Sequence, residues 1–331
     1  MDGTARQSGS PEPVRPLQAT VVISTRNRKD ELRVALASCL TQTAKPEIIV
    51  LSDGSTDGTA EMVRAEFPTV TLYDYPTSSG PAGRRNHGVR TAAGDVIITL
   101  DDDIEFISPT TLEHTLREFD DPRIGAVTIP FINVRGDQSI AHQRAPDSNA
   151  VYLTDAFVAC ACALRRDVML SAGLFRPCTI MYGEEEDLSI RMLDNGFFIR
   201  LGSADPLNHY ASPRRSTKRM DVLGARNKIL FSWFNIPLPY LLFHLPGSIF
   251  RRISFGFRAG APLNALQGLA WGLGAAARYF FLRAPVRRTT YRLFRLLRRR
   301  QALPLDELPQ GWRHRRDWSG GRAVATDSPT P

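Results

Sequence analysis

Three consecutive aspartates, Asp101-Asp102-Asp103, constrain the fold of this chain more than any other feature. They directly follow residues 96–100, an apolar run that is rich in β-branched side chains and too short for a helix. Such a run is typical of a buried strand in a parallel sheet. The carboxylates are therefore expected at the carboxyl end of a strand, where open α/β sheets bind their ligands.

Adjacent carboxylates repel one another, and a fold tolerates them when a cation or hydrogen-bond donors offset the charge. Carboxylate oxygens suit Mg²⁺ or Mn²⁺, and magnesium often joins one or two carboxylates to the phosphates of a substrate. Asp101 and Asp103 are two residues apart on a segment expected to be extended, so they should face one side and Asp102 another. An acidic loop that caps a helix is the alternative interpretation.

Strand-like and helix-like segments alternate through roughly the first two hundred residues, which is the pattern of an α/β domain. The expected strands cover 20–24, 48–51, 70–75, 95–100, 124–131 and 156–164. The expected helices lie at 32–40, after the turn cluster 53–58, and at 84–92, 166–172 and 182–195. We expect Ser55 or Thr56 to cap the helix that follows the turn cluster.

A set of short motifs accompanies the aspartates in a fixed order. They are Ile23-Ser24-Thr25-Arg26-Asn27-Arg28, Asp53-Gly54-Ser55-Thr56-Asp57, Gly80-Pro81-Ala82-Gly83-Arg84-Arg85-Asn86, Asp101-Asp102-Asp103, Gly183-Glu184-Glu185-Glu186-Asp187-Leu188 and His209. Together they resemble the family 2 glycosyltransferases of the bacterial cell-envelope type, over residues 19 to about 235. The resemblance implies the GT-A fold, an α/β fold with a Rossmann-like, mixed but mostly parallel sheet and flanking helices.

The resemblance also implies a hexosyl- or deoxyhexosyltransferase that depends on a divalent cation. Such an enzyme transfers the sugar of a nucleotide-diphosphate donor with inversion of configuration at the sugar carbon. By the family's pattern, the donor contacts a set of side chains after the strands. They are Thr25, Arg26 and Asn27 along the nucleoside, Asp53 at the base or ribose, Arg84 and Arg85 near the diphosphate, and Asp101 and Asp102. The metal ligands implied are Asp101, Asp103 and His209, with the last aspartate of the motif as the direct ligand.

The acidic run at residues 184–187 opens a helix, where carboxylates favour the helix dipole, but four in succession exceed that need. The resembling enzymes carry their catalytic base, an aspartate, in a Glu-Asp pair here, and Glu185 stands at the matching position. Glu184 and Asp187, three residues apart on one helix face, offer an alternative. Crowded carboxylates raise one another's proton affinity, which suits a base that works near neutral pH.

The basic charge of the chain is concentrated near its end. Residues 251–331 hold 16 arginines and 4 acidic side chains, whereas the whole chain has a net charge of +8. Arginines alternate with aromatic and leucine side chains up to residue 300, a composition typical of amphipathic helices on anionic lipid. A packed helical appendage with a solvated basic face is the alternative. Residues 262–282 are long enough to span a bilayer but contain Arg278 and several polar residues, which favours lying on the surface.

These patterns predict four regions: a disordered arm at 1–18, the glycosyltransferase domain at 19–235, an amphipathic basic helical region at 236–302, and a flexible tail at 303–331. No signal-peptide pattern begins the chain, and its four cysteines form no paired motif, which favours a reducing cytoplasm. We expect a peripheral enzyme on the inner face of the plasma membrane.

The expected partners are a nucleotide-diphosphate sugar, a lipid-linked or cell-envelope glycan acceptor and an anionic membrane surface. No nucleic-acid partner is expected, because no binding motif accompanies the arginines. Two alternatives stay open: a GT-A-like nucleotidyltransferase, and an inactive scaffold that binds membranes or nucleic acid. The residues Ser24-Thr25-Arg26-Asn27 disfavour the first, since a glycine-rich basic signature is expected there. The retained acidic motifs disfavour the second.

Overall fold

The computed structural model describes residues 15–211 and 216–313. Its centre is a large mixed sheet, in which the described strands follow the order β13-β9-β11-β6-β10-β4-β1-β2-β3. Their bounds are β1 (Ala19–Thr25), β2 (Glu47–Asp53), β3 (Thr71–Tyr75), β4 (Val96–Asp101), β6 (Ile124–Thr128), β9 (Tyr152–Thr154), β10 (Ala161–Arg165), β11 (Phe198–Arg200) and β13 (Leu303–Pro304). A smaller sheet holds β5 (Ile104–Glu105), β12 (Leu207–His209), β7 (Phe131–Asn133) and β8 (Ala141–His142), in that order.

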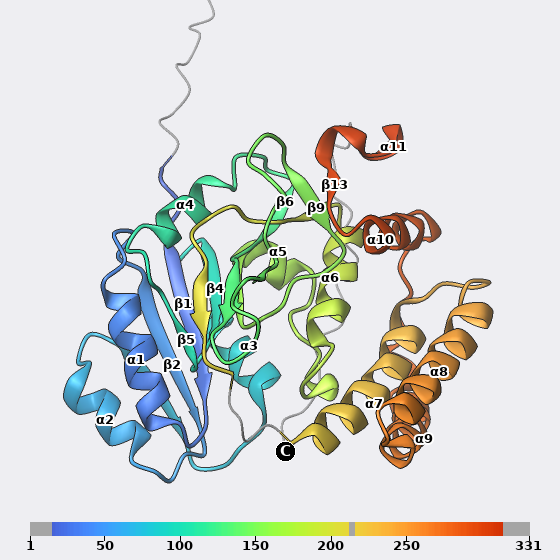
Figure 1. Cartoon of the computed structure of the whole chain (residues 1–331), viewed down its shortest axis with the longest axis horizontal. Helices are drawn as coiled ribbons and strands as arrows, with labels where there is room; N and C mark the ends of the chain where they lie inside the picture. Colours follow the sequence, from blue (N-terminus) through green and yellow to red (C-terminus); the bar gives the residue numbers. More distant parts are fainter. Residues whose placement is uncertain (1–14, 212–215, 314–331) are drawn as a thin grey trace, which may run out of the picture.

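Helices flank the large sheet and extend to one side of it (Figure 1). Their bounds are α1 (Lys29–Leu40), α2 (Thr59–Glu66), α3 (Pro81–Thr91), α4 (Thr111–Arg117), α5 (Arg166–Ser171), α6 (Glu184–Asp194), α7 (Thr217–Asn235), α8 (Leu241–Arg258), α9 (Pro262–Arg278), α10 (Arg288–Arg300) and α11 (Gln310–Arg313). The expected α/β architecture with a helical carboxyl-terminal region is confirmed.

Alternate side chains of each strand enter two separate cores, as the pleat of a sheet requires. On β1, Val21 and Ile23 pack into one core with side chains of α1, α2, α4 and α10. Val22 faces the opposite core, which side chains of α3, α5 and α6 complete. The sheet is therefore covered on both faces, and only its strand ends can present polar side chains to a ligand.

Three local expectations from the sequence were wrong. Residues 124–131 form two strands in different sheets, because Pro130 has no N–H to continue the ladder. The strand expected at 156–164 begins only at residue 161. The start of α2 is held by Asp57 rather than Ser55 or Thr56: its carboxylate accepts from the N–H of Thr59 at 3.1 Å.

The end of the described chain belongs to the same folded body as the first two hundred residues. Leu293, Phe294 and Leu297 of α10 are buried in the core that also contains β1. Further on, β13 pairs with β9 at the edge of the large sheet, and Trp312 is buried in the same core. The prediction of a flexible tail at 303–331 is thus wrong for residues 303–313. Residues 314–331 lie outside the described residues. Of the expected arm, 1–14 also lie outside, and Arg15 pairs with Asp95 at 2.7 Å.

α7, α8 and α9 pack together as a group of helices beside the sheet (Figure 1). The backbones of α7 and α9 approach closely because glycines lie at their contact: a Cβ on Gly268 would meet the Val222 carbonyl oxygen at 2.3 Å. None of the helices in the described part of the chain combines the length and the hydropathy that a bilayer crossing requires.

Candidate active site

The strands that carry the polar motifs end at the same edge of the large sheet. β1 lies between β2 and β4, and all three run parallel. Ser24 is level with Asp101, and Thr25 is level with Ser52, the residue before Asp53. The carboxyl ends of these strands therefore bring the motifs together, as the sequence predicts for an open α/β sheet.

The chain turns at the second and third aspartates, and this overturns the predicted geometry of the triplet. The strand β4 ends at Asp101, so Asp101 and Asp103 do not lie on one extended segment. Instead Arg28 Nη1 donates to Asp102 Oδ1 at 2.6 Å and to Asp103 Oδ2 at 2.8 Å. Sequence reasoning gave Arg28 no role, although it closes the first motif.

Asp102 is also bonded to the first motif, since Thr25 Oγ1 donates to Asp102 Oδ2 at 2.8 Å. Both side chains are buried. Burial raises the pKa of Asp102 to about 7, and the charge and hydrogen bonds of Arg28 only partly oppose this rise. Thr25 thus holds Asp102 in place by a hydrogen bond, and the nucleoside contact that the resemblance implies for Thr25 stays a prediction.

Asp103 lies beside His209, which β12 presents from the small sheet. His209 Nε2 is 3.4 Å from Asp103 Oδ1, and the Tyr210 N–H donates to the Asp103 carbonyl at 2.8 Å. Burial alone would raise the pKa of Asp103, but hydrogen bonds from His209 and Arg28 outweigh it and lower that pKa. The structure thus brings together two of the three predicted metal ligands.

The other ring nitrogen of His209, Nδ1, lies 2.7 Å from Asn133 Oδ1. A polar partner at the second nitrogen is what usually orients a metal-binding histidine. One carboxylate oxygen and one imidazole nitrogen suit Mn²⁺ or Mg²⁺ when substrate phosphates complete the shell. The pair therefore fits a metal shared with a substrate, although the described residues contain no group of three or more His, Cys, Asp or Glu side chains that could hold an ion by themselves.

Arg85 links the aspartates to the acidic helix. Its Nη2 donates to Asp101 Oδ1 at 2.6 Å, and its Nη1 lies 3.4 Å from Glu184 Oε1. Asp101 is thereby directed to Arg85 and not toward Asp103. Burial raises the pKa of Glu184 well above its usual range, and the neighbouring Glu185 adds to the rise while Arg85 opposes it.

The four carboxylates at the start of α6 have separate environments. Asp187 is fully buried, with Arg191 Nη2 at 2.8 Å, Asn235 Nδ2 at 2.7 Å and an ion pair to Arg176. Burial opposes its charge, but the two arginines lower its pKa below the usual range.

Glu186 is buried as well and pairs with Lys228 and with Arg298, the latter at 2.6 Å. Glu185 is the one member of this run that keeps a partly exposed side chain, and its Oε2 accepts from the Gly183 N–H at 3.2 Å. Glu185 is therefore the accessible carboxylate of this run, whereas Asp187 is held inside the fold and does not share a surface with Glu184.

The residues of the second and third motifs that are predicted to bind the sugar donor form a hydrogen bond with one another. Arg84 Nε donates to Asp53 Oδ1 at 2.6 Å, and its guanidinium carbon lies 3.4 Å from the centre of the Tyr75 ring. Burial would raise the pKa of Asp53, but hydrogen bonds from the Ser78 hydroxyl, the backbone and Arg84 lower it. Arg84 thus faces Asp53, while Arg85 turns to the aspartate triplet.

The remaining predicted donor residues lie on an exposed turn after β1. Arg26 and Asn27 are both exposed. Asn27 adopts a φ of +53°, which a short polar side chain tolerates, and its Oδ1 accepts from the Thr56 N–H at 2.7 Å. This contact ties the first motif to the second, so the two motifs form one rim of the site.

The fold and this site define a protein of the GT-A class of glycosyltransferase folds. Residues 20–171 match the model of the family described as glycosyl transferase family 2. These 152 residues of the 331-residue chain are similar to glycosyltransferase family 2.

Curated relatives agree with this similarity. The succinoglycan biosynthesis protein ExoU of Rhizobium meliloti is 29% identical over 203 residues, which are 55% of this chain and 58% of that protein. An uncharacterized glycosyltransferase of Haemophilus influenzae is 36% identical over 101 residues, 29% of this chain and 40% of that protein. The chain thus matches less than two thirds of the length of either relative.

A solved structure shares the fold. The mannosyltransferase PcManGT from Pyrobaculum calidifontis, in complex with GDP-Man and Mn²⁺, superimposes with a TM-score of 0.55 at 20% identity. The match covers 83% of this chain and 86% of that one. The likeness extends beyond the residues that match the family model, and at this identity it concerns the fold.

Proposed function

We propose that the protein transfers a sugar, with inversion, from a nucleotide-diphosphate donor to a hydroxyl of a lipid-linked or cell-envelope glycan. The observation that carries the proposal is the link through Arg85 between Asp101, at the end of β4, and Glu184, at the start of the acidic helix. It brings a donor-binding edge and a partly exposed carboxylate into one site. The names of ExoU and of a poly-β-1,6-N-acetyl-D-glucosamine synthase from Staphylococcus aureus, 30% identical over 114 residues, support an envelope acceptor.

In the proposed mechanism Asp103 and His209 would hold Mn²⁺ or Mg²⁺. The bound cation would offset the negative charge of the donor diphosphate. Arg28 keeps Asp103 ionised through its 2.8 Å hydrogen bond, and Asn133 orients His209. The rim made by Arg26, Asn27, Asp53 and Arg84 is assigned to the nucleoside side of the donor. Arg85 and Asp101 are assigned to the diphosphate side.

Glu185 is proposed as the general base. Inversion by direct displacement needs a carboxylate that takes the proton of the acceptor hydroxyl while the nucleotide diphosphate departs from the opposite side of the sugar carbon. Burial and the neighbouring Glu185 raise the pKa of Glu184 well above its usual range, which makes a second negative charge beside Glu185 unfavourable. A positioned general base contributes roughly 10²–10⁴-fold to the rate.

The experiment that tests the function is a donor screen. The purified full chain is incubated with a panel of nucleotide-diphosphate sugars and Mn²⁺ or Mg²⁺, and release of nucleotide diphosphate is measured. We expect slow hydrolysis of one donor that stops when the cation is chelated. Release of pyrophosphate from nucleoside triphosphates, without hydrolysis of any sugar donor, would instead identify a nucleotidyltransferase.

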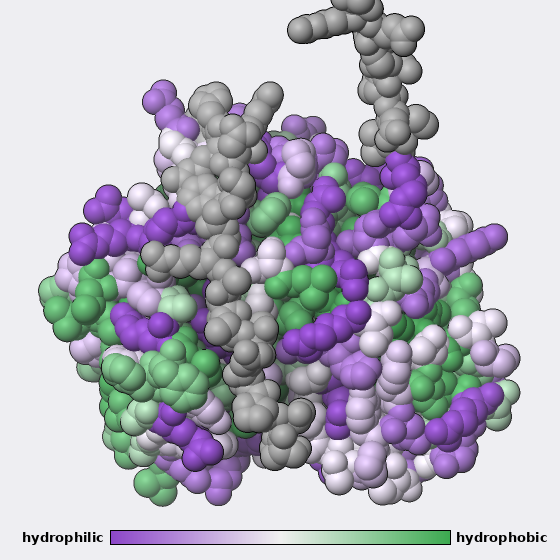
Figure 2. Space-filling view, turned by 180° about the vertical axis from the view of Figure 1, so that it is seen from behind, coloured by the Kyte–Doolittle hydropathy of each residue, from purple (hydrophilic) through white to green (hydrophobic). Residues whose placement is uncertain are grey.

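We further propose that the protein works on the inner face of the plasma membrane, attached by α8, α9 and the segment that follows. Large apolar side chains are exposed there, and Phe243, Phe250 and Phe281 are 79%, 71% and 77% exposed. Figure 2 shows hydrophobic side chains gathered at the lower left of that view, where the helices beside the sheet lie. Arginines interleave with these side chains, which suits anionic lipid.

Binding to vesicles that contain anionic lipid, followed as salt is raised, tests this attachment. Salt screens the attraction between the arginines and anionic lipid, but it does not weaken the binding that comes from inserted aromatic side chains. Partial release is therefore expected. A Phe243→Ser/Phe250→Ser variant should bind more weakly. Absence of vesicle binding would favour a packed appendage with a solvated basic face.

A further inference from the structure

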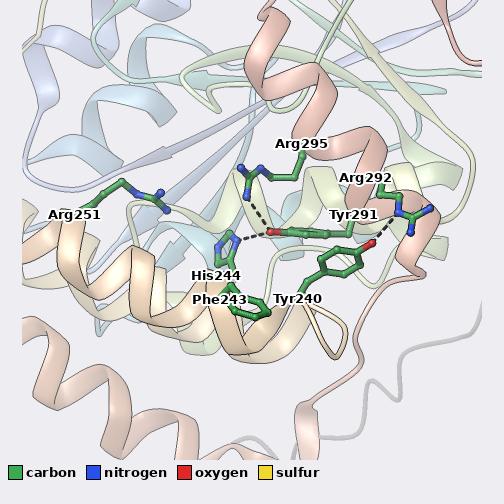
Figure 3. Close-up of a pocket in the computed structure, with 7 residues that line it drawn as sticks. All are labelled: Tyr240, Phe243, His244, Arg251, Tyr291, Arg292 and Arg295. Carbon is green, nitrogen blue, oxygen red and sulfur yellow. Dashed lines mark hydrogen bonds between the residues drawn. The ribbon is translucent and has the colours of Figure 1, made fainter.

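A cavity of about 350 Å³ lies between α8 and α10 (Figure 3), and none of the three aspartates of the triplet lines it. Side chains from α8, from the residue before it and from α10 line the cavity from two sides. They are Tyr240, Phe243, His244, Arg251, Tyr291, Arg292 and Arg295. None of the three arginines takes part in the proposed sugar transfer.

The arginines of this cavity are bonded to hydroxyl groups. Arg292 Nε donates to the Tyr240 hydroxyl at 2.7 Å, and Arg295 Nη1 donates to the Tyr291 hydroxyl at 3.2 Å. Arg251 Nη2 lies 3.3 Å from the Ser248 hydroxyl. These hydroxyl partners are neutral, and each guanidinium keeps further N–H donors.

A neighbour on the same helix shows the contrast. Arg298, one turn beyond Arg295, lies 2.8 Å from Asp155 Oδ2 and 2.6 Å from Glu186 Oε1. Within the ranges 15–211 and 216–313, by comparison, no carboxylate forms an ion pair with an arginine of the cavity. Three like charges around one cavity repel one another, and an anion between them removes that cost.

The groups between the arginines also suit an anion. His244 Nδ1 lies 2.8 Å from the Tyr291 hydroxyl, and burial lowers the pKa of His244 to about 4. The ring is therefore neutral at physiological pH and can take part in hydrogen bonding without a charge of its own. Two tyrosine hydroxyls and three guanidiniums together offer the donor-rich lining that phosphate oxygens accept from.

The cavity opens at the edge of an apolar stripe. Phe243, which lines it, is followed at intervals of seven residues by Phe250 and Phe257, and all three are exposed on α8. Seven residues are about two helical turns, so these rings lie on one side of the helix. An anion site bordered by exposed phenylalanines fits a molecule that joins a phosphate to hydrocarbon chains.

We propose that this cavity binds the phosphate group of an anionic membrane phospholipid, held by Arg251, Arg292 and Arg295 while the phenylalanines of α8 enter the bilayer. The proposal rests on the proposed membrane attachment and does not require the transferase activity. Because Arg298 joins α10 to Glu186 of α6, the bound headgroup lies beside the helix that carries Glu185. The pocket would thereby fix the orientation of the acceptor side of the enzyme toward the membrane.

The test compares two variants that remove equal charge from the same helix. Arg292→Gln/Arg295→Gln alters the cavity, and Arg299→Gln/Arg300→Gln removes two exposed arginines that do not line it. Affinity is measured on phosphatidylcholine vesicles containing phosphatidic acid. We expect the cavity variant to lose at least about tenfold more affinity than its control, because bidentate arginine contacts to phosphate are stronger than diffuse attraction. Equal losses would overturn the proposal.

A second vesicle preparation separates phosphate recognition from charge. Cholesteryl hemisuccinate replaces phosphatidic acid at equal surface charge, and the difference between the two variants should then disappear. If the difference in vesicle affinity between the two variants persists, the cavity recognises negative charge and not phosphate, and the phosphate assignment is overturned. Thermal protection by inorganic phosphate, lost in the cavity variant and accompanied by equal vesicle affinities, would assign the cavity to a soluble phosphate and overturn the lipid source.

Two measurements keep the outcomes interpretable. Arg292→Lys/Arg295→Lys keeps both charges, and intermediate vesicle affinity is expected, since lysine cannot form the bidentate contact. Affinity equal to that of the unaltered chain would count against a phosphate pocket. Donor hydrolysis is assayed in every variant and should be unchanged. If no chain hydrolyses any donor, the proposed transferase function fails, while the vesicle comparison still decides the role of the cavity.

Discussion

The ring of Phe294 on α10 lies 5.6 Å from the ring of Phe231 on α7, so the basic helix near the end of the chain is part of the hydrophobic core. Phe294 has no exposed surface, and its neighbours Leu293 and Leu297 are buried with it. The arginines of α10 lie on the remaining faces of the helix. A chain that ends at residue 235 would therefore leave one side of the core open to water.

Phe294→Ala is expected to lower the free energy of unfolding by about 3–5 kcal/mol, because it opens a cavity in a packed core. Urea unfolding measures the loss. Phe281→Ala is the matched control: this ring is 77% exposed, so its removal should change stability by about 0.5 kcal/mol or less. A chain ending at residue 235 should fail to fold, and a cooperative transition in that shortened chain would contradict the role given to α10.

Asp103→Ala should abolish metal-dependent binding of a nucleotide diphosphate, since it removes the carboxylate beside His209. Titration calorimetry with Mn²⁺ present and absent measures this. Asp205→Ala, at an exposed carboxylate, is the control and should bind as the unaltered chain does. The same metal-dependent affinity in both variants would remove the proposed metal role of Asp103. Circular dichroism should show that both variants are folded.

Glu185→Gln should reduce turnover by roughly 10²-fold or more with little change in donor affinity, because the amide keeps the size of the side chain but cannot accept a proton. Single-turnover rates and donor affinity are measured separately. Glu184→Gln is the informative comparison, since burial raises the pKa of Glu184 and disfavours its charged form. If Glu184→Gln loses more activity than Glu185→Gln, the base has been assigned to the wrong member of the pair.

Asp187→Asn should be defective in stability rather than in chemistry. The substitution leaves Arg176 and Arg191 buried without their shared counter-charge. Breaking a buried pair in this way costs about 3–5 kcal/mol, and guanidinium unfolding measures it. A variant that is fully stable but inactive would restore Asp187 as a candidate base.

The strand that ends at the aspartates was predicted from the sequence. The different hydrogen-bond partners of the three aspartates were not. An apolar run with a polar end specifies a buried strand, whereas the turn at Asp102 depends on β5 pairing with β12, about a hundred residues later. That pairing is also what places His209 beside Asp103. Arg28 was missed for the same reason, because its two aspartate partners are more than seventy residues away in sequence.

The end of the chain shows a different limit of sequence reasoning. The spacing of Leu293, Phe294 and Leu297 predicts an amphipathic helix, which the structure has as α10. An apolar stripe of this kind can face lipid or protein, and its spacing is the same in both cases. Only the packing of α10 against the sheet domain decides that its stripe faces protein. The phenylalanines that stay exposed on α8 are the ones proposed to enter a membrane.

The buried position of His244 predicts a dependence of stability on pH. Its pKa is lowered to about 4 in the folded chain by burial and by the charges of Arg295, Arg251 and Lys228, which outweigh the opposing charge of Glu186. In the unfolded chain a histidine titrates near pH 6.5. The folded state therefore binds fewer protons than the unfolded state between these two values.

The contribution of His244 to stability is consequently complete above about pH 6.5 and is lost as the pH falls toward about 4. The shift corresponds to at most about 3 kcal/mol, and partial solvent access reduces the expected loss to about 1–2 kcal/mol. Unfolding by urea is measured at pH 7.0, 5.5 and 4.5 on the unaltered chain and on His244→Gln, which cannot titrate. As the pH is lowered, the difference in free energy of unfolding between the unaltered chain and His244→Gln should shrink by about 1–2 kcal/mol. A constant difference across the range would mean that His244 is protonated equally in the folded and unfolded chains.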